Sequence, residues 1–101
     1  MSLSLISIDA QHAELSGAMT KSTVMSVLSQ GQQLLKSAQG QWQLDMAAVT
    51  QVSSAGAALL LDWLRTAKAS HVEFHIQNLP QAMRPIFAIS DLDPLFEDVL
   101  C

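Results

Sequence analysis

Residues 44–56 read LDMAAVTQVSSAG, and this stretch decides the fold. Alternate residues of 42–46 are apolar, a pattern that predicts a strand with one buried face. A short turn follows, and a helix is expected to open at the Ser-Ser-Ala-Gly corner. Ser53 and Ser54 therefore lie where a helix presents unpaired N–H groups and the positive end of its dipole.

The paired serines allow a structural and a functional interpretation. Either hydroxyl can cap the helix by accepting a hydrogen bond from a free N–H group. The functional interpretation is a contact point or phosphorylation site with Ser54 as the phosphoacceptor, because a helix N-terminus also suits a phosphate. A small hydrolase that uses Ser54 is a third alternative, but Gln51 and Val52 precede the two serines, so the Gly-x-Ser-x-Gly frame of a nucleophile elbow is missing. We therefore expect no enzyme and no catalytic residue.

Composition predicts a single globular domain over residues 1–101. Half of the residues are hydrophobic and 14% are charged. A chain of this length has room for only one core, so some of its apolar side chains are expected to remain on the surface. The formal net charge is −4 and the five Lys and Arg residues are scattered, so nucleic-acid binding is not expected. Exposed apolar surface on a weakly charged domain favours a protein partner.

Metals, cofactors and disulfides are not expected. His71, Glu73 and His75 would share one face of a strand, but a metal site needs a further ligand and close convergence. Cys101 is the only cysteine, so no internal disulfide can form, and this terminal thiol is interpreted as inert. No apolar run approaches the roughly 20 residues of a membrane span and no secretory leader is visible, so we expect a cytoplasmic protein.

The remaining sequence predicts further strands and helices around this corner. Strands are predicted at residues 3–8, 13–15, 41–46 and 72–77, and helices at 55–69 and 81–90. Another helix should begin at a cap provided by Thr20 or Ser22, with Gly31 on its apolar stripe permitting close packing. Pro85 should kink the last helix or delay its start, and residues 91–100 should form a short strand or a turn of helix. The short first turn favours an antiparallel pair, and the strand–helix–strand unit favours a parallel one.

The helix over residues 55–69 has an apolar stripe and an outward side. The stripe consists of Gly56, Ala57, Leu60, Trp63, Leu64 and Ala67. The outward side carries Ala58, Asp62, Arg65 and Thr66. Leu59 and Leu61 flank the stripe, so both are expected to be only partly covered.

The same stretch resembles the signature of STAS domains (sulfate transporter and anti-sigma factor antagonist). The matching positions are Asp45-Met46-Ala47 at its opening, the aliphatic Val49 and Val52, Ser54 at the family's Ser/Thr, and Gly56 at its Gly. Ser53 stands where the family has Asp. The resemblance implies an α/β fold with a mixed four- to five-stranded sheet and helices mainly on one face.

The resemblance also implies a function, because STAS domains are mostly non-catalytic interaction modules. In anti-sigma factor antagonists, a partner kinase phosphorylates the Ser that follows the Asp. In the maintenance-of-lipid-asymmetry (Mla) phospholipid transporter, a small STAS protein binds the ABC ATPase subunit. Residues 13–20 (AELSGAMT) look like the Leu-Ser-Gly phrase of the Mla subunit, and residues 56–61 (GAALLL) are similar to its helix start. Ser53 in place of Asp argues against the kinase branch.

The leading expectation is a cytoplasmic STAS subunit that binds and supports the ATPase of an ABC-type phospholipid transport system. Such a system maintains outer-membrane lipid asymmetry, and the subunit would act at the inner face of the inner membrane. The alternative is an antagonist-like switch phosphorylated on Ser54 by an anti-sigma factor kinase. The partner-binding surface is expected to comprise Ser53, Ser54, Ala55, Ala58, Leu59, Leu61 and Asp62.

Overall fold

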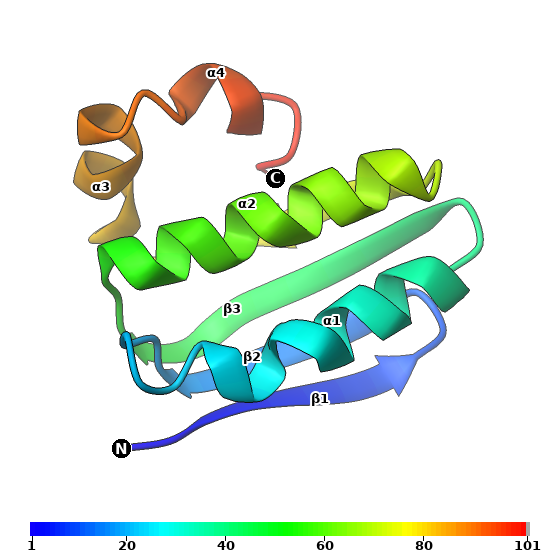
Figure 1. Ribbon diagram of the computed structural model, residues 1–101, viewed down its shortest axis with the longest axis horizontal. Helices are drawn as coiled ribbons and strands as arrows, with labels where there is room; N and C mark the ends of the chain where they lie inside the picture. The colour runs from blue at the N-terminus through cyan, green and yellow to red at the C-terminus, as the bar shows by residue number, and fades with distance from the viewer. Residues whose placement is uncertain (101) are drawn as a thin grey trace.

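Strands and helices alternate along most of the chain. A computed structural model describes residues 1–100, which form four strands and four helices. In chain order they are β1 (Leu3–Asp9), β2 (His12–Ala18), α1 (Met25–Ser37), β3 (Gln41–Gln51), α2 (Ser54–Ala69), β4 (Glu73–Gln77), α3 (Met83–Ile89) and α4 (Asp93–Phe96). The predicted order is confirmed as far as the third helix, and the short α4 follows it (Figure 1).

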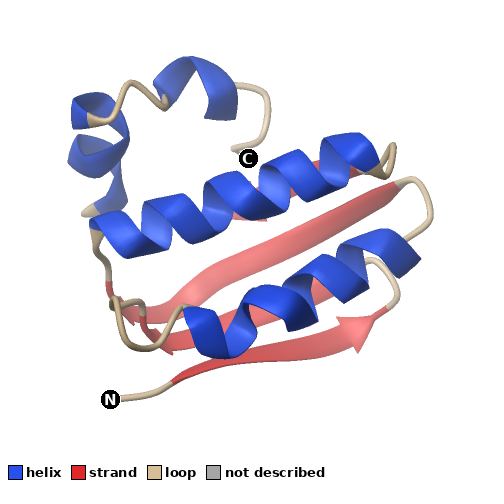
Figure 2. Cartoon of the chain, in the orientation of Figure 1, coloured by secondary structure: helices blue, strands red, loops and turns tan. Residues whose placement is uncertain are grey.

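The four strands form one mixed sheet in the order β1-β2-β3-β4. β1 and β2 are antiparallel, whereas β2–β3 and β3–β4 are parallel pairs connected by the two long helices. α1 and α2 pack against each other on the same face of the sheet (Figure 2), and α3 and α4 lie on the side of α2 away from α1. The predicted fold class, a mixed sheet with helices mainly on one face, is confirmed with four strands.

The alternation of apolar and polar residues separates the two faces of this sheet. Leu15, Leu44 and Ile76 are fully buried beneath the helices, as central residues of three neighbouring strands. Their neighbours along the strands point to the opposite face, where Gln43 and His75 stay partly exposed. The sheet therefore has one covered apolar face and one bare face, which is polar along the central β3 and along β4.

Two tryptophans join the helical layer to the sheet. Trp42 of β3 and Trp63 of α2 meet edge to face with ring centroids 5.9 Å apart, and Trp42 stacks on Phe74 of β4 at 5.6 Å. Trp63 also reaches α1, where its Nε1 donates a hydrogen bond of 3.1 Å to the Leu28 carbonyl oxygen. A Cβ added to Gly31 would lie 2.2 Å from the Trp63 ring, so this glycine permits the close packing predicted for it.

The end of the chain closes over the outer edge of β4. Phe87 of α3 stacks on Phe96 of α4 with ring centroids 4.6 Å apart, and both side chains are buried. The Ile76 N–H donates to the Val99 carbonyl oxygen at 2.8 Å, and Ile76 forms a parallel bridge with Leu100. This segment, predicted as a short strand or a turn of helix, therefore forms the turn of helix and a single bridge to β4.

Two predicted details near α1 and β3 are wrong for tertiary reasons. β3 continues past residue 46 to Gln51 because β2 runs beside it and supplies backbone partners. The expected cap of α1 by Thr20 or Ser22 does not form, since Val24 holds the N-cap position without a side-chain hydrogen bond. The Thr23 hydroxyl instead donates to the last carbonyl of β2 at 2.6 Å, which ties the turn before α1 to the sheet.

The third helix starts later than the predicted residue 81. It begins at Met83, and Pro85 falls in its first turn, where an intrahelical N–H donor is not needed. The delayed start expected from the proline is therefore confirmed. Helix α3 is short as a result, and it is held in place by the buried Met83 and Phe87.

Candidate partner-binding site

The two serines at the start of α2 have different roles in the structure. Ser53 is the N-cap residue, and its Oγ accepts a hydrogen bond of 3.4 Å from the Gly56 N–H. Ser54 is the first residue of the helix and its side chain is exposed. The capping role therefore belongs to Ser53, and the hydroxyl presented to solvent belongs to Ser54.

The corner between β3 and α2 rests on the chain that leaves β2. The Met19 N–H donates to the Gln51 carbonyl oxygen at 2.8 Å, which links this chain to the last residue of β3. Met19 is fully buried, and a Cβ on Gly56 would lie 2.9 Å from its Cε. The glycine at this motif position thus brings the first turn of α2 close to Met19.

Beside this corner, an open apolar groove of about 400 Å³ lies between α2 and the beginning of α1. Its lining consists of Lys21, Val24, Met25, Leu28, Ala55, Ala58, Leu59 and Asp62. Met25 is 69% exposed although it is apolar, and Ala55 and Ala58 are too small to fill the space above them. The two charged members are of opposite sign, and the Asp62 carboxylate accepts a hydrogen bond of 2.8 Å from Gln32 Nε2 of α1.

The groove collects four of the seven residues predicted for the partner surface, namely Ala55, Ala58, Leu59 and Asp62. Ser54 and Ala58 are exposed, and the set of Ser53, Ala55, Leu61 and Asp62 is partly exposed. The expectation of a partly covered Leu59 is wrong, because α1 packs against α2 and leaves this side chain only 4% exposed. Leu59 therefore contributes to the floor of the groove, whereas Leu61 is partly covered as predicted.

Sequence reasoning missed the wall of the groove that α1 and the turn before it provide. Lys21, Met25 and Leu28 are more than 25 positions from the residues of α2 that they face. One feature of the sequence pointed to this wall: Met25 is apolar but does not belong to the buried stripe of its helix. Which residues lie across from it depends on the packing of α1 against α2.

The Asp at the opening of the motif has a structural role. One oxygen of Asp45, Oδ1, accepts hydrogen bonds of 2.9 Å from the Ala47 N–H and from Asn78 Nδ2. Asn78 follows β4 directly and has a left-handed backbone with φ 57°. Asp45 therefore holds the turn after β4 beside the irregular middle of β3.

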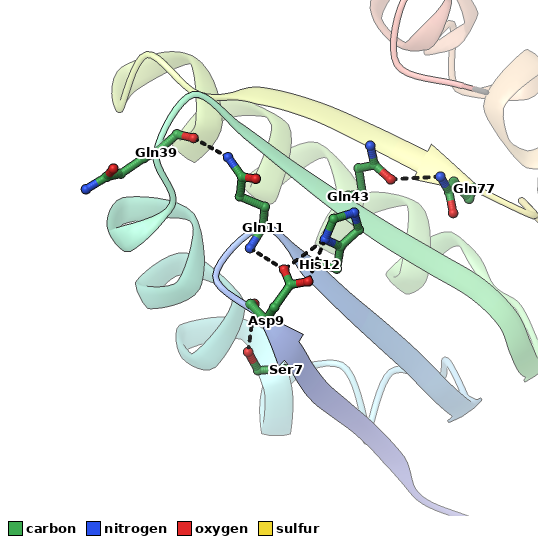
Figure 3. A network of polar contacts seen from close by, with 7 residues as sticks. All are labelled: Ser7, Asp9, Gln11, His12, Gln39, Gln43 and Gln77. Carbon is green, nitrogen blue, oxygen red and sulfur yellow. Dashed lines mark hydrogen bonds and ion pairs between the residues drawn. The ribbon is translucent and has the colours of Figure 1, made fainter.

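A second polar network lies at the turn between β1 and β2, at the end of the sheet away from the serine corner (Figure 3). Asp9 Oδ1 accepts a hydrogen bond of 2.8 Å from the Gln11 N–H and lies 2.8 Å from His12 Nδ1. The Gln11 N–H is the larger cause, and His12 the next, of an Asp9 pKa below its usual value. The Gln11 side chain also reaches the carbonyl oxygen of Gln39 at 2.6 Å, which fastens this turn to the end of the α1–β3 connection.

The expected row of His71, Glu73 and His75 does not form. β4 begins only at Glu73, and His71 precedes it with φ 57°, at the end of α2. Within residues 1–100, no three His, Cys, Asp or Glu side chains gather as metal ligands would.

No helix in that same part of the chain combines the length and apolarity needed to cross a membrane. Cys101, interpreted as an inert thiol, lies outside the described residues.

The fold and the serine corner define a class of α/β domain, in which a mixed sheet carries two helices on one face and a capped helix start follows its third strand. The family described as "Mlab, STAS domain" matches residues 6–97. The chain therefore belongs to the STAS domain family, as the motif predicted. STAS domains are generally binding and regulatory domains. None of the curated proteins compared with the chain matches it.

Solved structures support the same fold. The anti-sigma factor antagonist SpoIIAA in its unphosphorylated form superposes with a TM-score of 0.66 at 16% identity, over 86% of this chain and 82% of that chain. The Bacillus cell fate determinant SpoIIAA in the phosphorylated form gives a TM-score of 0.68 at 16% identity, over 98% of this chain and 88% of that chain. At this level of identity the likeness establishes the fold.

Proposed function

We propose that this chain is a non-catalytic, cytoplasmic STAS subunit that binds and supports the ATPase of an ABC-type phospholipid transport system. Such a system would maintain outer-membrane lipid asymmetry, with this subunit at the inner face of the inner membrane. The observation that carries the proposal is the apolar groove beside the exposed Ser54 hydroxyl. The Mla description of the matching family supports the choice of partner.

The proposed partner surface extends from the serine corner along the groove. It comprises Ser53, Ser54, Ala55, Ala58, Leu59, Leu61 and Asp62, joined by Lys21 and Met25 from the α1 side. Small residues at the centre let a partner approach the backbone of α2 closely, and the exposed Met25 adapts to the shape of an inserted side chain. The opposite charges of Lys21 and Asp62 give the partner a fixed orientation.

A negative charge at Ser54 should leave folding intact and weaken binding of the partner. In the isolated domain, Asp at the first position of α2 faces the positive end of the helix dipole, a favourable effect of about 0.3–1 kcal/mol. Under a bound partner the same carboxylate loses its water, and that cost exceeds the dipole effect unless the partner supplies a cation. We therefore expect Ser54→Asp to melt at or slightly above the parent temperature and to lose the ATPase subunit.

The experiment compares Ser54→Asp with Ser54→Thr, which keeps the hydroxyl. Each variant is co-expressed with the ATPase subunit from the same host, and pull-down yield and melting temperature are measured together. Ser54→Thr should retain binding and should complement an outer-membrane lipid defect, whereas Ser54→Asp should do neither. Full binding by Ser54→Asp would remove Ser54 from the interface and contradict the assignment.

A matched pair of arginine substitutions tests the groove itself. Ala58 lines the groove, whereas Ala69 is exposed at the far end of the same helix. Ala58→Arg should fill the groove and lower ATPase binding at least about tenfold, a change that corresponds to 1.4 kcal/mol. Ala69→Arg should bind like the parent. Equal binding by the two folded variants would show that the partner contacts another surface.

The alternative function is an antagonist-like switch in which an anti-sigma factor kinase phosphorylates Ser54. The exposed hydroxyl at a helix N-terminus favours it, as does the shared fold with SpoIIAA, which has been solved in both phosphorylation states. The test is mass spectrometry of the protein from its host and after incubation with the cognate kinase. Phosphate on Ser54, absent from Ser54→Ala, would favour the switch over the transporter subunit.

A further inference from the structure

β1 is a free edge of the sheet with an orderly set of outward backbone groups. The Ala18 N–H donates to the Ser2 carbonyl oxygen at 2.9 Å, and antiparallel pairs alternate between bonded and non-bonded positions. The backbone groups of Ser4 and Ile6 therefore face β2, and those of Leu3, Leu5 and Ser7 face away from it. One outward group already accepts a single hydrogen bond, since Gln30 Nε2 of α1 donates to the Leu5 carbonyl oxygen at 2.8 Å.

This edge has little of the protection that edge strands usually carry. β1 contains no Lys, Arg or Pro, and its single charge is Asp9 at the end, where the register with β2 shifts. β1 also exposes two large apolar side chains, since Ile6 is 52% exposed and Ile8 is 61% exposed. α1, which packs beside β1, contains one charged residue, Lys36. The flank formed by β1 and α1 is thus almost uncharged.

We propose that β1 pairs with β1 of a second copy of this chain, antiparallel and with the two-fold axis at Leu5, to form a continuous eight-stranded sheet. In this register Leu3 bonds to Ser7 of the other copy through their outward groups. Leu5 lies opposite its own counterpart, and its carbonyl oxygen uses its two lone pairs to accept from Gln30 Nε2 and from the Leu5 N–H of the other copy. On the bare face of the sheet, Ser4 then lies beside Ile6 of the other copy. The regular part of β1, before the register shift, is sufficient for this pairing.

Charge and chemistry select a second copy as the occupant. Only another extended strand can bond to the alternating N–H and C=O groups of the edge. Each chain has a formal net charge of −4, so two copies repel each other, and the nearly uncharged flank of β1 and α1 is where they meet at least cost. The strand is self-complementary around Leu5. A short strand and one helix flank bury little area, so the dimer belongs to the small interfaces below about 1,200 Å² and dissociates on dilution.

The first test measures association of the full chain by sedimentation over a range of concentrations. The parent should show a reversible monomer–dimer equilibrium. Ile6→Lys places a charge opposite Ser4 and diagonal to the same charge on the other copy, and it should weaken dimerisation at least about tenfold. Ala69→Lys, with the same charge change at an exposed site on α2, should dimerise like the parent. A parent that stays monomeric up to about 1 mM, or equal association by Ile6→Lys, would overturn the proposal.

The second test determines which residues of the two β1 strands lie opposite each other. Ser4→Cys and Ile6→Cys are made separately in a Cys101→Ser background and mixed under mild oxidation. Opposite residues at a non-bonded antiparallel site have Cα atoms about 4.5 Å apart, within the range of a disulfide. The mixture should form the mixed disulfide in preference to either homodimer. Cross-linking of Ile6→Cys alone with equal efficiency, or none in the mixture, would contradict pairing around Leu5. Both tests are independent of ATPase binding, which uses the other side of α1.

Discussion

At the residue scale, the helical preference and the packing conflict at Gly31. Alanine would favour the α1 helix by about 1 kcal/mol over glycine. Its Cβ, however, would meet the Trp63 ring at 2.2 Å, and that ring is held by its hydrogen bond to the Leu28 carbonyl oxygen. We expect Gly31→Ala to lower the free energy of unfolding by about 1–3 kcal/mol through overpacking.

Urea denaturation measures this effect, and Ser29→Ala is the matched control. Ser29 lies two residues earlier in α1 and is exposed, so its replacement by alanine should leave stability equal or slightly higher. A Gly31→Ala variant as stable as Ser29→Ala would show that α1 can move away from Trp63 at no cost.

The Asp9 carboxylate gives a pH-dependent prediction at the same scale. Because its pKa is lowered in the folded state, the ionised form favours folding above the unfolded pKa of about 3.9. That contribution is lost as the pH falls through the lower folded pKa. The Gln11 N–H is the main cause, so the Asp9 pKa measured by NMR titration should stay below its usual value in His12→Ala. A return to the usual value in that variant would assign the shift to His12 instead.

At the element scale, the two ends of α2 are built differently. Ser53 caps the start with its side chain, whereas the chain leaves the last turn through His71 in the left-handed region, φ 57°. A residue with a Cβ is disfavoured in that region, and glycine is the usual choice directly after a helix. We expect His71→Gly to raise the free energy of unfolding by about 0.5–1 kcal/mol.

The control is His75→Gly, two residues inside β4, where glycine weakens a strand. Thermal denaturation should therefore shift upward for His71→Gly and downward for His75→Gly. Equal shifts in the same direction would mean that the backbone at His71 carries no strain.

At the scale of the whole molecule, one aromatic cluster connects α2, β3 and β4. Trp42 and Trp63 are the only tryptophans, both are buried, and Phe74 extends their contact. We propose that residues 1–101 unfold as one domain, so urea transitions followed by tryptophan fluorescence and by far-UV circular dichroism should coincide. Separate midpoints would show that the α3–α4 region, held by its own Phe87–Phe96 stack, unfolds independently.

The sequence by itself determined the element order, the buried stripe of α2 and the serine corner. The spacing of apolar residues and the chemistry of helix caps are local properties of the chain. Trp63 and Leu64 could therefore be placed in the core, and Ser53 at a helix start, without knowledge of the fold. The antiparallel and parallel pairs followed from the connection lengths in the same way.

Only the tertiary structure decided which surfaces remain open. Leu59 is buried because α1 lies against it, and the groove exists because Met25 and Ala58, far apart in sequence, come to face each other across the two helices. The length of β3 was likewise set by its partner β2, beyond the end of the alternating pattern. Period and propensity describe one segment at a time, whereas a groove, a strand end or a free edge depends on which other segment packs beside it.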